Sequence, residues 1–559
     1  MPYFYLNNKK VKYKKGETVL QVAKREGIDI PNLCHHPDLS IRAVCRVCLV
    51  EIKGRKDLVT ACSTEIEPDM EVKTNSKAVK KARATNLELI FATHREECRD
   101  CVLLNDCPLL KYAKQYKLSI GRFIDRKNQR PVYNFSNSVE IDGTQCIDCG
   151  SCIEACTNLQ KIDCLQFTNK GYKQELKPKK QSPCIYCGQC ALHCPVFSAQ
   201  EQTNWQEIES ILNKKENNKS NKILVAQIAP SVRASLSEAF GQKSGKISVK
   251  QIASALKKLG FDYVFDVNFA ADITTLVEGE ELLERLTHKN SILPMMTSCC
   301  PAWVRYVEVY QPQLIPHLTT SRSPQIHGGA VIKQYFSKLK NIKAKDIEIV
   351  SIMPCTAKKH EAKREELKIK GLKPVDLVLT IREFSFLLQR NNIDPTKLKE
   401  VPLDDPLAKH SGSAAIYGGS GGVMESALRS VASKKQNLNF KAVRGQKGIK
   451  EASFKIKGKN LQVAVVSGIG NIENLLKNLK KYDYIEVMAC PGGCIGGGGQ
   501  VIPTTKEIIK KRQASLYKLE DKSLFKRANE NKQVNEVRKW FKENNLEKSS
   551  LHTKYRKAK

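Results

Sequence analysis

Hydrophobic and polar positions alternate regularly over the second half of the chain. Short apolar runs such as ILVAQI, from residue 223, and YVFDV, from residue 263, predict buried strands. Between them, SVKQIASALKKLG has apolar residues at helical spacing and stops at Gly260, which predicts an amphipathic helix. SILPMM and IEIVSIMP each lead through a loop into a helix-like segment, and YDYIEVMA leads into a glycine-rich run. This alternation predicts an α/β region with mostly parallel sheets over about residues 223–505, within a domain spanning 210–505.

The remaining segments have other patterns. A strand-like alternation begins at Tyr3, and we expect a small β-grasp-like domain over residues 1–78. Residues 200–222 are polar and rich in Asn and Lys, which predicts a linker or an exposed connection. After Ile508 the chain is polar, lysine-rich and helical in pattern, so we expect segment 506–559 to wrap around the body. At about 150 residues per domain, this length predicts three or four domains.

Cysteine usage points to metal binding in a reducing compartment. The 559 residues include 21 cysteines, which fall in tight clusters with two-residue gaps, a spacing that suits metal ligands better than disulfides. The N-terminus has no apolar signal segment and no evident transit-peptide pattern, so we expect a cytoplasmic location, with organellar import left open. No apolar run of about 18 residues exists and the mean hydropathy is −0.40, so no membrane insertion is expected.

The net charge is strongly positive. Lys and Arg number 93 against 58 Asp and Glu, which gives +35. The lysines are scattered along the chain, so the first interpretation is a solvated surface, and the second is a docking field for an acidic protein partner. No recognition motif supports nucleic-acid binding.

The first cysteine cluster lies in the N-terminal segment. A distant first thiol, a close pair in VCRVCLVEI and a later fourth are the plant-type ferredoxin arrangement in outline, with a longer first gap. We expect residues 1–78 to hold one [2Fe–2S] cluster, with a zinc site as the alternative. The expected ligands are Cys34, Cys45, Cys48 and Cys62.

The second cluster, in HREECRDCVLLNDCP, has the spacing His-x3-Cys-x2-Cys-x5-Cys. By geometry alone, a zinc ion fits this set as well as an iron–sulfur cluster does. Because the segment lies between two iron–sulfur segments, we expect residues 79–125 to hold a [4Fe–4S] cluster with one imidazole ligand. The expected ligands are His94, Cys98, Cys101 and Cys107.

The third and fourth clusters both follow C-x2-C-x2-C-x3-C, the pattern of bacterial two-cluster ferredoxins. They predict two [4Fe–4S] cubanes within residues 126–209. In such ferredoxins the fourth cysteine of each run binds the other cluster, so Cys194 should complete the first cubane and Cys156 the second. The full set is Cys146, Cys149, Cys152, Cys156, Cys184, Cys187, Cys190 and Cys194.

Six cysteines remain: Cys164, Cys299, Cys300, Cys355, Cys490 and Cys494. The last five directly follow predicted strands, at the sheet edge where α/β proteins form their active sites, so three loops should bring thiols to one place. The glycine-rich run 492–499 would let backbone approach a bulky inorganic ligand. A phosphate loop is the alternative, but no Gly-Lys-Ser/Thr follows. Cys164 is expected to be a small buried hydrophobic residue.

Three segments of the α/β region resemble the signature motifs of [FeFe]-hydrogenases: TSCCPAW from Thr297, MPCTAKKHE from Met353 and EVMACPGGCIGGGGQ from Glu486. The upstream clusters resemble the monomeric clostridial type with four accessory clusters. The resemblance covers almost the whole chain. It implies a multidomain α/β and α+β fold with a [2Fe–2S] ferredoxin domain, a His/Cys3-ligated domain, a two-cluster ferredoxin domain, a large α/β catalytic domain and a small-subunit-like tail.

The resemblance also implies an H-cluster, a [4Fe–4S] cluster bridged to a di-iron subsite whose CO, cyanide and azadithiolate ligands are installed by maturation proteins. Electron-rich iron bearing cyanide needs donor contacts, which Lys358 and Ser231 can give, and an apolar shell would exclude water. Gln325 would bond a carbonyl ligand. The residues implied as ligands are Cys300, Cys355, Cys490 and Cys494, the last of which would bridge to the di-iron unit, and those implied as further contacts are Pro230, Met353 and Met488.

A proton route is implied as well. Cys299 stands beside the ligand Cys300, so one thiol of the pair can remain free and, by the resemblance, donate to the azadithiolate amine. Family members commonly carry Ser where this chain has Thr319, which keeps the hydroxyl. The glutamates rest on VEGEELLER, which also contains Glu280, and the alternative is that they are ordinary exposed helix residues. Buried relay carboxylates should have raised pKa values. The residues implied in the route outward from Cys299 are Glu278, Glu281, Thr319 and Arg285.

The implied activity is reversible reduction of protons to H2, with electrons from an acidic ferredoxin entering at the [2Fe–2S] or His94 cluster. One alternative is the catalytic subunit of an electron-bifurcating, NAD-linked hydrogenase complex, although we see no flavin or nicotinamide site in the chain. The large iron–sulfur subunit of respiratory NADH dehydrogenase is disfavoured because it lacks TSCCP and CPGGC. A non-enzymatic alternative is an iron–sulfur assembly factor or H2 sensor, but such relatives usually lose the N-terminal clusters or Cys299.

Overall fold

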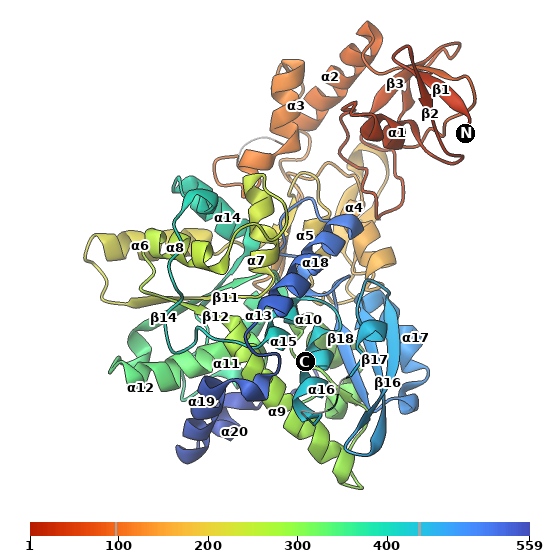
Figure 1. The fold of residues 1–559 in the computed structure, drawn as a ribbon. Helices are drawn as coiled ribbons and strands as arrows, with labels where there is room; N and C mark the ends of the chain where they lie inside the picture. The colour runs from red at the N-terminus through yellow and green to blue at the C-terminus, as the bar shows by residue number, and fades with distance from the viewer. Residues whose placement is uncertain (95–97, 434–435, 437, 559) are drawn as a thin grey trace.

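The N-terminal segment forms a mixed five-stranded sheet packed on one helix, drawn in red in Figure 1. This computed structural model describes residues 1–94, 98–433, 436 and 438–558. The sheet order is β2-β1-β5-β3-β4, and β1 runs parallel to β5. Alternate residues such as Phe4, Leu6 and Val72 are buried against the helix, as period-2 patterning requires. The elements are β1 (Tyr3–Leu6), β2 (Lys9–Lys12), α1 (Val19–Arg25), β3 (Leu49–Ile52), β4 (Val59–Thr60) and β5 (Glu71–Lys73).

Two helices and several short strands follow. Helices α2 (Lys77–Phe91) and α3 (Pro108–Tyr116) pack together beside the N-terminal sheet (Figure 1). The next segment contains a three-stranded sheet of order β10-β7-β6 and a separate β8–β9 hairpin. Its elements are β6 (Val132–Phe135), β7 (Val139–Asp142), α4 (Ser151–Glu154), β8 (Leu165–Thr168), β9 (Glu175–Pro178), α5 (Gln189–Leu192) and β10 (Ala199–Glu201).

The α/β region contains two four-stranded sheets. The first, of order β12-β11-β14-β15, is parallel throughout, and its core includes residues of α8, α9 and α14. Gly260, with φ of 104°, ends α8 as the sequence predicts. The elements of this sheet and around it are α6 (Trp205–Glu216), β11 (Ile223–Ile228), α7 (Val232–Ser235), α8 (Val249–Leu259), β12 (Tyr263–Asp266), α9 (Val267–Thr287), α11 (Pro324–Val331), α12 (Ser337–Leu339), β14 (Ile347–Met353), α13 (Ala357–Ala362), β15 (Leu377–Thr380) and α14 (Ile381–Arg390).

The second sheet, of order β13-β18-β17-β16, is parallel except for the β16–β17 hairpin. It lies across the molecule from the first sheet, and helices α10, α13 and α15 lie between the two in Figure 1. The parallel strands of both sheets end toward this intervening region. The elements are β13 (Met295–Met296), α10 (Pro301–Tyr310), α15 (Gly412–Ala415), α16 (Gly422–Val431), β16 (Ile449–Ile456), β17 (Lys459–Ser467), α17 (Ile472–Leu476) and β18 (Tyr484–Met488).

The C-terminal segment wraps around this body, as its polar, helical pattern predicts. Helix α18 (Lys506–Lys522) contacts α7 and α15, α19 (Lys532–Glu543) contacts α9, and α20 (Glu547–Leu551) contacts α11. The chain then runs on as an extended tail that reaches Glu308, whose carbonyl accepts from the amide of Ala558. Segments far apart in the sequence therefore lie side by side.

We expected residues 200–222 to be a linker or an exposed connection. The segment is largely exposed, but it is not an unstructured linker, because β10 ends at Glu201 and α6 occupies Trp205–Glu216. Trp205 is 1% exposed and packs edge-on against Phe386, so four apolar residues at helical spacing anchor an otherwise polar segment. The other strands and helices quoted from the sequence are confirmed, although SILPMM yields only the two-residue strand β13. Among the described residues, no helix is long and apolar enough to cross a membrane.

Candidate metal centres and proton route

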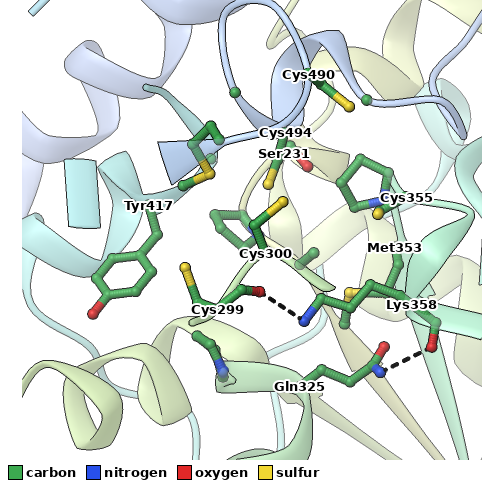
Figure 2. A pocket seen from close by; sticks show the side chains of 18 of the residues that line it. Ser231, Cys299, Cys300, Gln325, Met353, Cys355, Lys358, Tyr417, Cys490 and Cys494 are labelled. Atoms are coloured by element: carbon green, nitrogen blue, oxygen red, sulfur yellow. Dashed lines mark hydrogen bonds between the residues drawn. The ribbon is translucent and has the colours of Figure 1, made fainter. Parts of the chain in front are cut away.

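A cavity with about 790 Å³ of empty space lies where the strands of both sheets end. Cys299 and Cys300 lie between β13 and α10, Cys355 follows β14, and Cys490 and Cys494 follow β18. Prolines help to form these corners, because Pro301 starts α10. Figure 2 shows the sulfurs around one shared space. The structure thus brings together the five thiols that the strand ends predict.

The thiols of this cavity are enclosed, and a charge on one thiol raises the pKa of its neighbours. Burial, and then the charges of Cys300 and Cys494, raise the pKa of the Cys355 thiol. Burial raises the pKa of Cys494 to about 12, with Cys300 contributing next. So many thiolates in a low-dielectric space need a compensating cation. The set therefore fits a metal cluster.

The rest of the lining also fits a cluster with small inorganic ligands. The walls are largely apolar and include Met353 and Met488, which are 3% and 2% exposed. Within the described part of the chain, the buried Ser231 Oγ and Gln325 Oε1 have no hydrogen-bond partner. Two buried polar atoms on the lining of an apolar cavity are costly unless something in it bonds to them. Pro230 lines the same cavity beside Ser231.

Lys358 reaches the cavity from α13 as one end of a buried network. Its Nζ donates to Cys299 O at 3.1 Å and to Glu361 Oε2 at 2.7 Å. Burial alone would lower the pKa of Lys358, but the charge and hydrogen bond of Glu361 raise it above its usual value. Gln325 Nε2 donates to Lys358 O and to Glu361 Oε2. Both donors of Gln325 are engaged by the protein, so a bond from Gln325 to a carbonyl ligand would require its amide to rotate.

Glu278 and Glu281 of α9 are not ordinary exposed helix residues. Glu278 is 0% exposed, and burial raises its pKa to about 8, with the charges of Glu281 and Glu486 adding to the effect. Glu278 Oε1 accepts from the Tyr484 hydroxyl at 2.5 Å, while Oε2 has no partner among the described residues. The charge of Glu278 also raises the pKa of Cys299, after burial. Glu278 is therefore close enough to Cys299 to influence it.

Glu281 lies one turn farther along α9 and binds two of the predicted route residues. Thr319 Oγ1 donates to Glu281 Oε2 at 2.7 Å, and Arg285 Nη2 donates to Glu281 Oε1 at 2.6 Å. Glu280, by contrast, pairs with Arg538 of α19 and points away from this set. The structure thus separates the third acid of VEGEELLER from the other two.

Sequence reasoning missed three contributors to this region: Glu361, Tyr484 and Tyr417. Glu361 lies three residues after Lys358, and i,i+3 spacing on a helix could have revealed the pair. Tyr484 looked like one more apolar strand residue in YDYIEVMA. Tyr417 lines the cavity and hydrogen-bonds Thr275 at 2.7 Å, but nothing in its local sequence marks it.

The four thiols of the first cluster lie together in the N-terminal domain as two contacting pairs. A hydrogen bond joins Cys34 to Cys45 and is the largest contribution to the lowered pKa of Cys34. A second joins Cys48 to Cys62 and likewise contributes most to the lowered pKa of Cys48. The charge of Cys34 acts on Cys48 as well. Four neighbouring thiols are the ligand set that a [2Fe–2S] cluster requires.

The His94 group lines a second cavity of about 930 Å³ together with Cys98, Cys101 and Cys107. His94 Nδ1 lies 2.8 Å from Gln145 O, a contact that makes Nδ1 the donor and leaves Nε2 for a metal. Residues 95–97, within the spacing of this motif, lie outside the described residues. Where the chain is described, no three His, Cys, Asp or Glu side chains are drawn together as a single ion would require. His94 and the three thiols line a space that would accommodate a multi-iron cluster.

In space, the two C-x2-C-x2-C-x3-C groups exchange their fourth cysteines. Cys156 lines a cavity of about 390 Å³ with Cys184, Cys187 and Cys190. At the other group, burial and then the charges of Cys146, Cys149 and Cys194 raise the pKa of Cys152. Cys156 therefore joins Cys184, Cys187 and Cys190. Cys194 joins the group that begins at Cys146.

Cys164 is buried at 2% exposure, as expected, but it is more than a packing residue. It lines the same cavity, and its side chain hydrogen-bonds Cys184. Its amide also donates to Cys156 Sγ at 3.3 Å. Cys164 thus contacts two predicted ligands of one cubane.

The groups form a connected series. The charge of Cys34 in the first thiol group raises the pKa of Cys149. The ring centroids of His36, which follows Cys34 closely, and His193, which precedes Cys194, lie 4.6 Å apart. At the other end, Cys490 Sγ lies 3.9 Å from Cys187 O. A Cβ on Gly498 would collide with the backbone of Cys187 and Gly188. The glycine run therefore allows the backbone lining the central cavity to pack closely against segment 184–190.

Comparisons with known proteins agree with this arrangement. Residues 222–498 match the iron only hydrogenase large subunit, C-terminal domain, and residues 3–77 match a 2Fe-2S iron-sulfur cluster binding domain. The chain is 36% identical to the NADP-reducing hydrogenase subunit HndD of Solidesulfovibrio fructosivorans, over 98% of both chains. It is 35% identical to Iron hydrogenase 1 of Clostridium pasteurianum, over 94% of both.

Two further comparisons cover only part of the chain. The solved structure of apo [FeFe]-hydrogenase HydA1 from Chlamydomonas reinhardtii matches with a TM-score of 0.57 and 35% identity, over 64% of this chain and 99% of that one. Cytosolic iron-sulfur assembly component 3 of Rattus norvegicus is 32% identical, over 60% of this chain and 75% of its own length.

Proposed function

Because the chain belongs to the [FeFe]-hydrogenase family, we propose that it catalyses reversible reduction of protons to H2 with electrons from a reduced ferredoxin. One observation carries the proposal: five thiols from three distant loops line one cavity, and one of them, Cys299, is adjacent to another in sequence. Four thiols can hold a cubane while the fifth stays free to move a proton.

In the central cavity the residues divide into ligands, donors and packing residues. Cys300, Cys355, Cys490 and Cys494 would hold the H-cluster, which when bound supplies the open iron site and pendant amine at which protons and electrons combine. Lys358 carries a positive charge and Ser231 a free hydroxyl, so both can donate to cyanide. Met353, Met488 and Pro230 exclude water from the cavity. Maturation proteins are required because no side chain encodes the small ligands.

Protons reach the cavity through side chains of this chain. The Cys299 thiol is the inner donor, and Glu278, with its raised pKa of about 8, holds a proton at neutral pH and can pass it on. Glu281 and Thr319 are hydrogen-bonded to each other and continue the route toward the surface. Burial therefore makes Glu278 a proton carrier.

Electrons pass through the series of thiol groups. We assign one [2Fe–2S] cluster to Cys34, Cys45, Cys48 and Cys62, and three [4Fe–4S] clusters to the His94 group and the two cubane groups. The His94 group includes the exposed Cys98, and His94 contacts the carbonyl next to Cys146. Both outer groups therefore lie next to the first cubane, and the second cubane leads to the central cavity.

An acidic ferredoxin fits the excess of 35 positive charges. Attraction between opposite charges speeds encounter and is screened by salt. The rate of electron transfer with a reduced ferredoxin should fall as ionic strength rises, and a rate that is flat in salt would argue against this partner.

A relative named as an NADP-reducing hydrogenase subunit supports a second candidate, the catalytic subunit of an NAD(P)-linked, electron-bifurcating complex. Copurification of partner subunits would identify it. A reducing, cytoplasmic setting suits the 21 thiols.

An iron–sulfur assembly or sensing role is the non-enzymatic alternative, because assembly proteins match 60% of the chain. The N-terminal thiol groups and the cavity position of Cys299 favour the enzyme. Infrared spectroscopy of protein matured with competent accessory proteins separates the two. We expect bands from iron-bound CO and cyanide together with H2 production, and their absence would overturn the proposal.

A further inference from the structure

We propose that His552, in the C-terminal tail, is the outer proton-relay residue of the catalytic cavity, a step that rests on the proposed function and extends it. His552 Nδ1 lies 2.8 Å from Thr320 Oγ1. That hydroxyl donates to Glu281 Oε2 at 2.8 Å. A continuous hydrogen-bonded path therefore joins a tail histidine to Glu281 of α9.

The geometry sets the direction of each hydrogen bond. Glu281 Oε2 also accepts from the backbone amide of Thr320 at 2.8 Å, so the amide and the hydroxyl of Thr320 both donate to this oxygen. A hydroxyl has one proton to give, and when it gives it to Glu281 it accepts from His552 Nδ1–H. The imidazole then has Nε2 left for exchange with water.

Arg285, which follows Glu281 by one turn, is poorly suited to carry protons. Its guanidinium donates to Glu281 Oε1 through Nε and Nη2. Its other bonds go to carbonyl oxygens, those of Pro316 and Leu318 among them. An arginine stays charged in proteins. Arg285 therefore positions Glu281, and the proton needs a neighbour that titrates.

The transfer balances with no co-reactant. A hydronium ion protonates His552 at Nε2 and leaves water, and the imidazolium releases the proton on Nδ1 to Thr320 Oγ1 while the hydroxyl proton moves to the Glu281 carboxylate. Glu281 becomes neutral and the hydroxyl is restored. His552 is left as the Nε2–H tautomer, and proton exchange with water returns it to the Nδ1–H tautomer. Reversal of the same steps releases protons during H2 oxidation.

His552 lies close enough to the solvent to exchange protons with water, and its pKa lies below the usual value of an imidazole. The side chain is half-buried, and the next residue but one, Lys554, is exposed. Burial lowers the pKa of His552, while the facing acids Glu281 on α9 and Glu547 on α20 raise it. Arg538 on α19 and Arg322 in the loop before α11 lower it. Charges of both signs therefore face the imidazole. Glu280 of α9 is also near, because the charge of His552 lowers the pKa of Glu280.

Backbone bonds hold the tail in place whichever side chain stands at position 552. The Thr553 amide donates to Thr320 O at 2.8 Å, and the Arg322 amide donates to Leu551 O at 3.0 Å. Arg322 Nε donates to the carbonyl of His552 itself at 2.8 Å. A substitution of the imidazole should therefore leave the path of the tail unchanged.

The test uses cofactor-loaded enzyme and a small viologen donor, so that it does not depend on the ferredoxin proposal. His552→Gln keeps a polar group beside Thr320 but cannot titrate, and we expect H2 production about tenfold slower with an altered pH profile. His552→Ala should be slow in the same way and should recover in added imidazole. Thr320→Val, which removes the hydroxyl, should slow H2 production in the same way. Thr320→Ser, which keeps it, should retain a rate close to wild type. His288→Gln, which changes an exposed histidine at the end of α9, is the matched control and should retain the wild-type rate.

Hydrogen exchange at the Thr553 amide reports whether the tail has stayed in place. A wild-type rate and pH profile in His552→Gln would overturn the relay. So would a slow His552→Ala variant that imidazole does not rescue and whose Thr553 amide exchanges faster, because the role would then be structural. A loaded wild-type protein without H2 turnover would overturn the proposed function itself, and the relay with it.

Discussion

Tyr484 on β18 donates its hydroxyl to Glu278 on α9 at 2.5 Å, although 206 positions separate them in sequence. Both side chains are 0% exposed. The bond stabilises the charged form of Glu278 and so lowers a pKa that burial raises to about 8. Tyr484 therefore sets how tightly the inner acid holds its proton.

Tyr484→Phe should raise the pKa of Glu278, because the hydrogen bond that favours the carboxylate is lost. We expect the alkaline limb of H2 production to move upward by about one pH unit. A pH–rate profile with a viologen donor measures this shift. Tyr482→Phe is the control, since that hydroxyl bonds the surface acid Glu451. An unmoved alkaline limb in Tyr484→Phe would mean that Glu278 does not control the rate.

Glu278 should also make folding stability depend on pH. Its folded pKa of about 8 lies above the ordinary 4.5, so the folded state binds the proton more tightly than the unfolded state does. This contribution is fully present below pH 4.5 and is lost as pH rises through about 8, with a total on the order of 5 kcal/mol. Glu278→Gln should remove that loss. Urea unfolding of the apoprotein between these pH values tests it, and Glu284→Gln, at an exposed site of α9, should behave like wild type.

The neighbouring thiols Cys299 and Cys300 should differ sharply in their effects. Cys299→Ser should lower turnover by a factor on the order of 10² to 10⁴ with iron content unchanged, because a proton donor is weakened and no ligand is lost. Cys300→Ala should lose iron from the central cavity. Iron analysis alongside activity separates the two effects. Full turnover in Cys299→Ser would eliminate it as the inner donor.

Cys164 should tune the cubane nearest the central cavity. Its side chain bonds Cys184 and its amide donates to Cys156 Sγ. Hydrogen bonds to ligand sulfurs help set cluster potentials, and they stabilise the more negative, reduced form. Cys164→Ala should therefore lower the midpoint potential of that cubane in a redox titration followed by electron paramagnetic resonance, while Cys164→Ser should keep a potential close to wild type. Identical potentials in all three proteins would show that Cys164 only packs.

Local patterns were sufficient for the parts of this protein that depend on neighbours in sequence. The spacing C-x2-C-x2-C-x3-C keeps three thiols close together along the chain, and the strand ends place Cys355 and Cys490 at a sheet edge, so both predictions required only local geometry. The helix α6 was missed because only four apolar residues anchor it in a polar segment.

The sequence by itself determined which residues could bind metal and where strands give way to helices, because both follow from repeats a few residues long. The family resemblance already implied Glu278 and Glu281 for the proton route. Only the tertiary structure decided that Glu280 pairs with Arg538, and only it placed Tyr484 and His552 beside that route. Those contacts join residues more than 200 positions apart. They are selected by the packing of sheets, helices and tail, for which no short pattern in the chain provides a signal.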